Sequence, residues 1–141
     1  MNLKIAILPG DGIGPEVTNE SIKVLKCIAD KYNHKIELSE GLVGAIAIEK
    51  YNDPYPDITH KICKDSDAIL FGAIGDPKYD NDPKAKIRPE QGLLKMRKKL
   101  GLYANLRPTI IFESLLDMSP IKEDRISGTD ILFVRELTGG I

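Results

Sequence analysis

The sequence has 141 residues, of which 42% are hydrophobic and 29% are charged, so we expect a globular protein of a length suited to one ordinary domain. A formal net charge of -1 and the lack of a long basic stretch argue against nucleic acid as a partner. No stretch approaches the roughly 18 apolar residues of a membrane span and the N-terminus lacks a signal-peptide core, so we expect no membrane association and a cytoplasmic protein.

The first elements predict a strand, a glycine-rich loop and a helix. Residues 3–8 form a short apolar run that Pro9 and Gly10 end, which is typical of a strand covered on both faces in a parallel sheet. Pro15 suits a first helical position, and apolar residues then recur at helical spacing up to Tyr32. This order is typical of the start of an α/β fold.

The next elements continue the alternation of strands and helices. We expect a short strand over residues 35–38 and a helix over residues 44–51. A surface turn rich in Pro and Asp over residues 52–57 precedes a further helical segment that ends near Lys64. Residues 67–74 form the second apolar run that predicts a buried strand.

A long polar segment follows this second buried strand. Residues 75–89 read GDPKYDNDPKAKIRP and combine prolines with mixed charge. Loops of this length inside a compact domain are usually functional or disordered, and this one leaves the end of a central strand, where α/β proteins bind ligands. We therefore favour a functional loop.

The remainder of the chain is less regular. A helix is expected over residues 89–100, followed by a short extended piece over residues 102–106. We expect Pro108 to break this piece, and a weak helical stretch then leads to a strand over residues 130–136. The sheet is expected to be incomplete within these residues.

The glycine loop does not match the fingerprint of a Rossmann dinucleotide-binding domain. In the sequence GDGIGP, Pro15 stands where the fingerprint needs its third glycine. Only Glu37 or Glu40 could be the acidic residue expected about twenty positions further on. The simplest interpretation of the glycines is a tight turn between strand and helix.

Three arginines stand at the ends of predicted elements. They are Arg97, Arg107 and Arg135. Each by itself is weak evidence, because a structural ion pair or a solvated side chain would also explain it. Together they could bind a small substrate with two carboxylates, because such a substrate needs several permanently charged, bidentate donors to replace its lost water.

Five collinear motifs resemble the isopropylmalate dehydrogenases of the isocitrate/isopropylmalate dehydrogenase family. They are GDGIGPE at residues 10–16, GAIGDPKYD at 72–80, RPEQGLLKMR at 88–97, NLRP at 105–108 and VRELTGGI at 134–141. The resemblance covers the whole chain and implies a two-domain α/β fold that binds NAD without a Rossmann domain, here incomplete. It makes residues 1–100 part of the first, NAD-contacting domain and residues 101–141 the start of a second, truncated domain for substrate binding and dimerisation.

The resemblance also implies the substrate-binding residues. The arginines matching Arg97, Arg107 and Arg135 bind the malate portion of the substrate in this family. Leu93 and Leu94 stand where isocitrate dehydrogenases carry polar residues, so they would suit an isopropyl group and reject a third carboxylate. The alternative for both leucines is ordinary core packing, because Glu90, Leu93, Leu94 and Arg97 recur at helical spacing on one face.

NAD binding is implied for a residue of the glycine loop and for the long polar segment. The positions are Ile13, Asp76, Pro77, Lys78, Tyr79, Asp80, Asn81, Asp82, Pro83, Lys84, Ala85, Lys86, Ile87, Arg88, Pro89 and Glu90. Glycine is common at position 76 in the family. An aspartate there is expected to weaken NAD binding by repelling the phosphates.

The implied activity is the oxidative decarboxylation of 3-isopropylmalate to 2-oxo-4-methylpentanoate with reduction of NAD, in leucine biosynthesis, by a homodimer. The family holds Mg or Mn with aspartates from later in the chain, and its general-acid tyrosine and lysine base would also follow Ile141. We therefore expect no catalytic or metal-binding residue within the chain, and an inactive, poorly folded product from these residues alone. The alternatives are a related enzyme acting on tartrate, malate or homoisocitrate, or a non-catalytic anion-binding module if the chain ends at Ile141.

Overall fold

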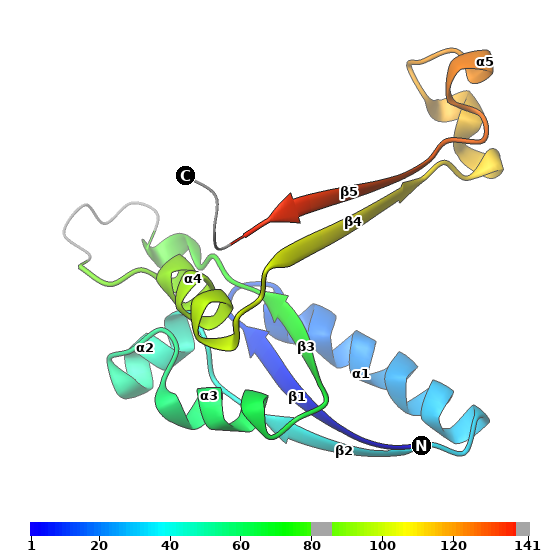
Figure 1. Cartoon of the computed structure of the whole chain (residues 1–141). Helices are drawn as coiled ribbons and strands as arrows, with labels where there is room; N and C mark the ends of the chain where they lie inside the picture. Colours follow the sequence, from blue (N-terminus) through cyan, green and yellow to red (C-terminus); the bar gives the residue numbers. More distant parts are fainter. Residues whose placement is uncertain (80–85, 138–141) are drawn as a thin grey trace. The chain divides into compact units, whose positions relative to one another are not determined.

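The structure is a computed structural model that describes residues 1–79 and 86–137. The chain divides into two compact units, Met1–Leu100 and Gly101–Ile141. Figure 1 labels the strands and helices of both units. Strands and helices alternate along the first unit, which confirms the predicted α/β fold.

The first unit contains a parallel sheet of three strands. These are β1 (Asn2–Gly10), β2 (Lys35–Glu40) and β3 (Ala68–Ala73), in the order β2-β1-β3. The central position of β1 explains its continuous apolar run, because both of its faces are covered. In a Rossmann half the third strand would pair with the second, whereas here β3 pairs with β1, so the fold is not of the Rossmann type.

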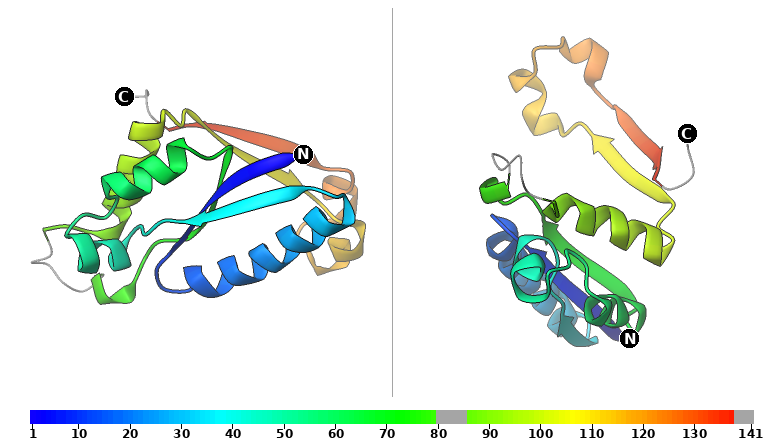
Figure 2. Two further views of the ribbon diagram at one scale, coloured as in Figure 1. Left: turned by 90° about the horizontal axis from the view of Figure 1, so that it is seen from below. Right: turned by 90° about the vertical axis from the view of Figure 1, so that its left-hand side faces the viewer.

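Helices lie on both faces of this sheet. The helix α1 (Gly14–Lys31) connects β1 to β2 along one face, while α3 (Asp57–Lys64) and α4 (Pro89–Leu100) lie on the other (Figures 1 and 2). A short helix, α2 (Ala45–Tyr51), follows β2, and a 3-10 turn, η1 (Pro77–Tyr79), follows β3. None of the helices in the described parts of the chain is long and apolar enough to cross a membrane.

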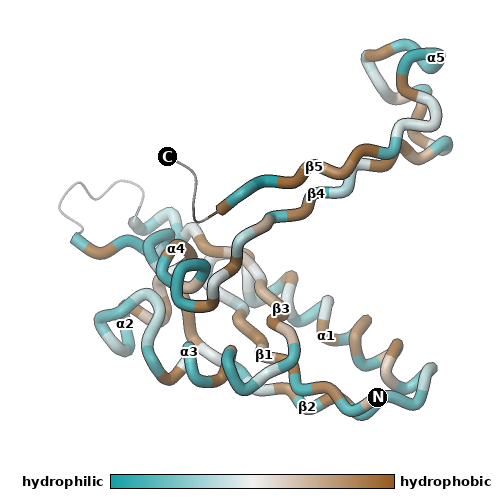
Figure 3. The backbone as a smooth tube through the Cα atoms, in the orientation of Figure 1, coloured by the Kyte–Doolittle hydropathy of each residue, from teal (hydrophilic) through white to brown (hydrophobic). Residues whose placement is uncertain are grey.

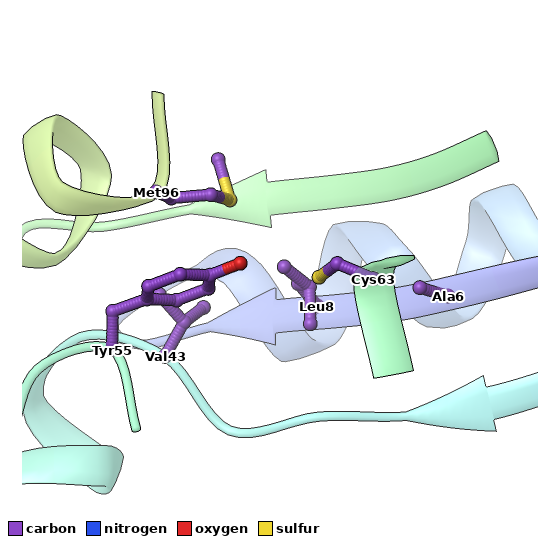
Figure 4. Close-up of a cluster of buried hydrophobic side chains, with 6 residues drawn as sticks. All are labelled: Ala6, Leu8, Val43, Tyr55, Cys63 and Met96. Carbon is purple, nitrogen blue, oxygen red and sulfur yellow. The ribbon is translucent and has the colours of Figure 1, made fainter. Parts of the chain in front are cut away.

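The core of the first unit lies between the sheet and the helices α3 and α4. Figure 4 shows its buried side chains, which are Ala6, Leu8, Val43, Tyr55, Cys63 and Met96. The Tyr55 hydroxyl lies 3.2 Å from Nδ1 of His60, which is only partly buried. Burial raises the pKa of the Tyr55 phenol above its usual range, and burial likewise raises the pKa of the Cys63 thiol, so both groups remain neutral within this core.

The second unit is built on a two-stranded antiparallel ribbon. Its strands are β4 (Ala104–Ile110) and β5 (Asp130–Glu136), joined through the 3-10 helix η2 (Glu113–Met118) and the short helix α5 (Glu123–Ile126). The hydropathy colouring in Figure 3 shows apolar residues along both strands. Because side chains alternate across a strand, Leu106, Ile110, Leu132 and Val134 share one face of the ribbon, and all four are exposed in this structure.

The predicted break at Pro108 is wrong. Pro108 lies inside β4 and is aligned with Leu132 of β5. Each strand of a two-stranded ribbon has one edge without a partner strand, and a proline on that edge removes no hydrogen bond from the ladder. The strand therefore continues to Ile110, beyond the end of the extended piece predicted over residues 102–106.

Two buried threonines of the first unit differ in their hydrogen bonding. Thr18, 2% exposed, lies on α1 against Gly72, and its hydroxyl has no hydrogen-bond partner. Thr59, 1% exposed, lies on α3 and donates its hydroxyl proton to the Leu42 carbonyl at 2.7 Å. The two residues form a matched pair for testing what a buried hydroxyl contributes to stability.

We expect Thr18→Val to raise the free energy of unfolding by about 1 kcal/mol, because valine keeps the shape and removes an unsatisfied polar atom. Thr59→Val is expected to lower it by about 1 kcal/mol, because the Leu42 carbonyl loses its donor. Urea unfolding of the two variants beside the parent protein measures both values. Equal shifts of the same sign would contradict the assignment of partners.

Candidate functional site

The carboxyl ends of β1 and β3 form the candidate cofactor site. α1 leaves β1 along one face of the sheet, while the connection from β2 to β3 carries α3 on the other face, so the topology switches between β1 and β3. Open α/β sheets bind their ligands in the crevice at such a switch point. The loop with the GDGIGP sequence and the loop after β3 border this position.

The carboxylate of Asp11 joins three segments at the switch point. Asp11 is 6% exposed. Its Oδ2 accepts a hydrogen bond from the Ala45 amide at 2.6 Å, and its Oδ1 accepts one from the Gly75 amide at 2.7 Å. Its own amide donates to the Ala73 carbonyl at 2.9 Å. The end of β1, the start of α2 and the loop after β3 are thus held at one side chain.

Two glycines allow this close approach. Gly10 has φ +79°, and a Cβ there would lie 1.9 Å from the Ala73 carbonyl oxygen. Gly44 has φ +78°, and a Cβ there would lie 2.2 Å from Oδ2 of Asp11. Glycine alone meets both demands without strain and without a clash. The glycine loop therefore makes the expected tight turn, which brings Gly10 into close contact with the end of β3.

The predicted cofactor residues on either side of the switch point lie near each other. Ile13 directly precedes α1 and is 56% exposed. A Cβ at Gly12 would contact the Gly75 carbonyl at 3.4 Å, so the loop that carries Ile13 lies against the residue that precedes Asp76. The structure therefore brings together these two separate parts of the predicted NAD site.

Asp76 and Lys78 are both engaged in local contacts. Oδ1 of Asp76 accepts a hydrogen bond from the Lys78 amide at 2.9 Å, so the side chain caps the 3-10 turn η1. Lys78 forms an ion pair with Glu49 of α2, in which Nζ lies 2.5 Å from Oε1. The hydrogen bond and the charge of Glu49 raise the pKa of the Lys78 ammonium. Pro77 and Lys78 are exposed, and Tyr79 is half-buried.

The rest of the predicted cofactor segment is described only in part. Six of its positions lie outside the described residues: Asp80, Asn81, Asp82, Pro83, Lys84 and Ala85. Beyond them, Lys86, Arg88 and Glu90 are exposed, Ile87 is half-buried and Pro89 is buried. The Arg88 amide donates to the Gln91 side chain at 3.1 Å, so Gln91 caps the start of α4.

The two predicted substrate leucines, adjacent on α4, differ in burial. Leu93 is half-buried and packs against the hydrophobic core, as the alternative of core packing predicted. Leu94 is 61% exposed, and Glu90 is also exposed. Arg97 is half-buried, and it lies on the same side of the helix as Glu90 and Leu94 by its spacing. Leu94 and Arg97 remain available to a ligand, whereas Leu93 supports the helix.

α4 is held in place by close backbone packing and by two lysines. A Cβ at Gly92 would lie 2.5 Å from the Pro54 carbonyl oxygen. Lys95 reaches both carboxylate oxygens of Asp53, at 2.8 and 2.5 Å. Lys99 contacts Asp57, the first residue of α3, at 2.6 Å. These contacts fix the helix that carries Leu94 and Arg97 to the segment before α3.

Arg107 and Arg135 lie on the same face of the ribbon in the second unit. Asn105 is aligned with Arg135, and Arg107 is aligned with Phe133. Residues two apart on a strand share a face, so the two arginines are diagonal neighbours. Arg107 Nε donates to Oδ1 of Asn105 at 3.1 Å, and both arginines are exposed. Arg97 belongs to the other unit, and each unit is described by itself.

Several residues that shape the site were missed by the sequence reasoning. Asp11, Glu49 and Asn105 each hold a predicted site residue or its loop through a polar side chain. Asn105 and Arg107 share a face only because β4 continues past residue 106, where the predicted extended piece ended. Asp11 and Glu49 contact residues distant in sequence, so no local pattern could identify their partners.

Within the described residues, no group of three or more His, Cys, Asp or Glu side chains could hold a metal ion.

Comparisons with known proteins show the family to which the chain is similar. The family model described as isocitrate/isopropylmalate dehydrogenase matches residues 4–141. A 3-isopropylmalate dehydrogenase of Bacteroides fragilis is 52% identical over 141 residues, which is 100% of this chain and 40% of that protein. One of Aquifex aeolicus is 54% identical over 138 residues, covering 98% of this chain and 38% of that protein. The chain thus spans about 40% of the length of such relatives.

A solved structure resembles the chain at lower sequence identity. The crystal structure of isocitrate dehydrogenase from Methylococcus capsulatus matches with a TM-score of 0.71 and 28% sequence identity. The match covers 98% of this chain and 35% of that one.

The ion pair between Lys95 and Asp53 should make the stability contributed by the attachment of α4 depend on pH. Partial burial opposes the ionisation of Asp53, but hydrogen bonds from the Lys95 ammonium and the Tyr55 amide outweigh it and hold the pKa below its ordinary value of 3.8. A carboxyl group whose pKa is lowered in the folded state stabilises the fold at pH values above its ordinary pKa. This contribution is lost as the pH falls through the lowered pKa.

We therefore expect Lys95→Met to lower the free energy of unfolding by about 0.5 kcal/mol at neutral pH, since the pair is partly exposed. The difference from the parent protein should shrink below pH 3.8 and vanish once Asp53 is protonated. Lys98→Met on the exposed side of the same helix is the control. A loss that is independent of pH, measured by urea unfolding over a pH series, would contradict the electrostatic origin.

Proposed function

Because the chain belongs to the isocitrate/isopropylmalate dehydrogenase family, we propose that a protein of its relatives' length carrying this chain oxidatively decarboxylates 3-isopropylmalate. The product is 2-oxo-4-methylpentanoate, NAD is reduced, and the reaction belongs to leucine biosynthesis. The observation that carries the proposal is about 50% identity across the whole chain to proteins named 3-isopropylmalate dehydrogenase. The enzyme is proposed to be a cytoplasmic homodimer.

The substrate is a small molecule with two carboxylates, and arginines are proposed to bind it. Arg107 and Arg135 share a ribbon face, so their guanidinium groups can converge on one anion. Arg97 of α4 would add a third permanent charge. Leu94, exposed one turn before Arg97, offers an apolar surface to the isopropyl group, while Leu93 supports it from the core side. The arginines are proposed to orient the substrate, and a third carboxylate next to Leu94 would lack a partner.

NAD is proposed to bind at the switch point between β1 and β3. The arrangement fits a dinucleotide in two respects: Ile13 is an exposed apolar residue, and the cation of Lys78 stands on the other loop. When bound, NAD accepts the hydride from the hydroxyl carbon of the substrate. Residues of the chain bind and orient the cofactor, and residues 86–90 would extend this contact toward α4. The first unit thereby contacts NAD, and the second serves substrate binding and dimerisation.

Mg²⁺ or Mn²⁺ enters the proposal only through the family. The described residues do not fit a metal centre, since they contain no cluster of potential ligands. The metal ligands, the general acid and the base are proposed to come from outside this chain.

A substrate panel tests the function. The complete protein should reduce NAD with 3-isopropylmalate, with carbon dioxide released in equal amount. Isocitrate should be a poor substrate, because its third carboxylate would be buried against leucine. Faster turnover of tartrate, malate or homoisocitrate would assign the protein to a related dehydrogenase, and anion binding without turnover would favour a binding module. Residues 1–141 alone are expected to be inactive.

Two substitutions at Asp76 separate its charge from its capping contact. Asp76→Asn removes the charge near the NAD phosphates and keeps an acceptor for the Lys78 amide, so we expect the KM for NAD to fall about threefold. Asp76→Gly removes both, and loss of the cap should cancel part of this gain. Steady-state kinetics at varied NAD concentration measures the two values. An unchanged KM in Asp76→Asn would rule out repulsion.

A further inference from the structure

The loop after β3 is tied to α2 at two points. At the start of α2, the Ala45 amide shares the Asp11 carboxylate with the Gly75 amide, at 2.6 and 2.7 Å. One turn further along α2, Oε1 of Glu49 pairs with Nζ of Lys78 at 2.5 Å. Both residues at which the loop is held therefore connect to the same short helix.

A polar contact holds Gly75, the first residue of this loop. Gly75 is exposed, and a Cβ built on it would have no neighbour within 4 Å. Its amide nevertheless donates to a carboxylate that is 6% exposed and that accepts a bond at each of its oxygens. A hydrogen bond to a buried charged group is among the stronger ones in proteins, so losing it would weaken the attachment at the start of the loop.

We propose that Asp11 and Glu49 are positioning residues for the dinucleotide: they hold the loop Gly75–Tyr79 against α2 in the conformation that binds NAD, without touching NAD themselves. This inference rests on the proposed function. A loop released from these ties would occupy other conformations, and the apparent affinity for NAD would fall in proportion to the population lost. The reacting carbon and the substrate arginines would be unaffected.

The test uses the complete enzyme with four single variants and one double variant. Asp11→Asn removes one of the two acceptor contacts and is expected to raise the KM for NAD about tenfold. Glu49→Ala and Lys78→Ala each remove the exposed ion pair and should raise it about threefold. The double variant of Glu49 and Lys78 should show no more than either single change. Glu20→Ala is the matched control, because Glu20 forms a 2.6 Å pair with Lys23 on the exposed side of α1.

Two readouts separate positioning from a general loss of structure. The KM for 3-isopropylmalate and kcat should stay within twofold of the parent enzyme in the Glu49 variant. The Gly75 amide should exchange its hydrogen faster in Asp11→Asn, with NAD absent. If Asp11→Asn lowers the stability of the whole protein, Glu49→Ala still tests the proposal, because it alters only an exposed side chain.

The possible outcomes are distinct. A raised KM for NAD in both Asp11→Asn and Glu49→Ala, with no additivity in the double variant, supports the proposal. A rise in Lys78→Ala without a rise in Glu49→Ala would mean that Lys78 acts on NAD without its partner, and would overturn the role of Glu49. Unchanged NAD kinetics in every variant of an active enzyme would overturn this inference only. A parent enzyme that does not reduce NAD would overturn the proposed function as well.

Discussion

The buried carboxylate of Asp11 is the contact on which the candidate site depends. Its two oxygens accept amides from the start of α2 and from the loop after β3, and its own amide binds the last residue of β3. Burying a carboxylate is unfavourable unless it is paired or hydrogen-bonded, and here both oxygens have donors. The glycines at positions 10 and 44 are required because side chains there would occupy the space of these contacts.

The charged residues of the two units have different surroundings. In the first unit, lysines of α4 pair with carboxylates that precede or begin α3, so the helix that presents Leu94 and Arg97 is fixed by its own charged residues. In the second unit, Arg107 and Arg135 stand on an exposed ribbon with Asn105 beside them. The large apolar side chains of this ribbon are exposed, and an isolated pair of strands is only marginally stable.

Much of the fold was predictable from periodicity. The apolar runs at residues 3–8 and 67–74 became β1 and β3, and Pro15 and Pro89 lie at helix starts as their fixed φ angle suggests. Pro108 was misjudged, because whether a proline interrupts a strand depends on which edge has a partner. Leu93 and Leu94 also differ in burial, since helical spacing gives a shared side of the helix but not the depth of burial on each flank.

By itself the sequence determined the alternation of elements, the failure of the Rossmann fingerprint and the family to which the chain belongs. These depend on local periodicity and on motifs that are contiguous in the chain. Only the tertiary structure decided that β3 pairs with β1, that the loop carrying Ile13 lies against Gly75, and that Asp11 and Glu49 contact the loop after β3. Hydrogen bonds between residues 29 to 64 positions apart leave no local pattern, because chain topology alone brings their partners together.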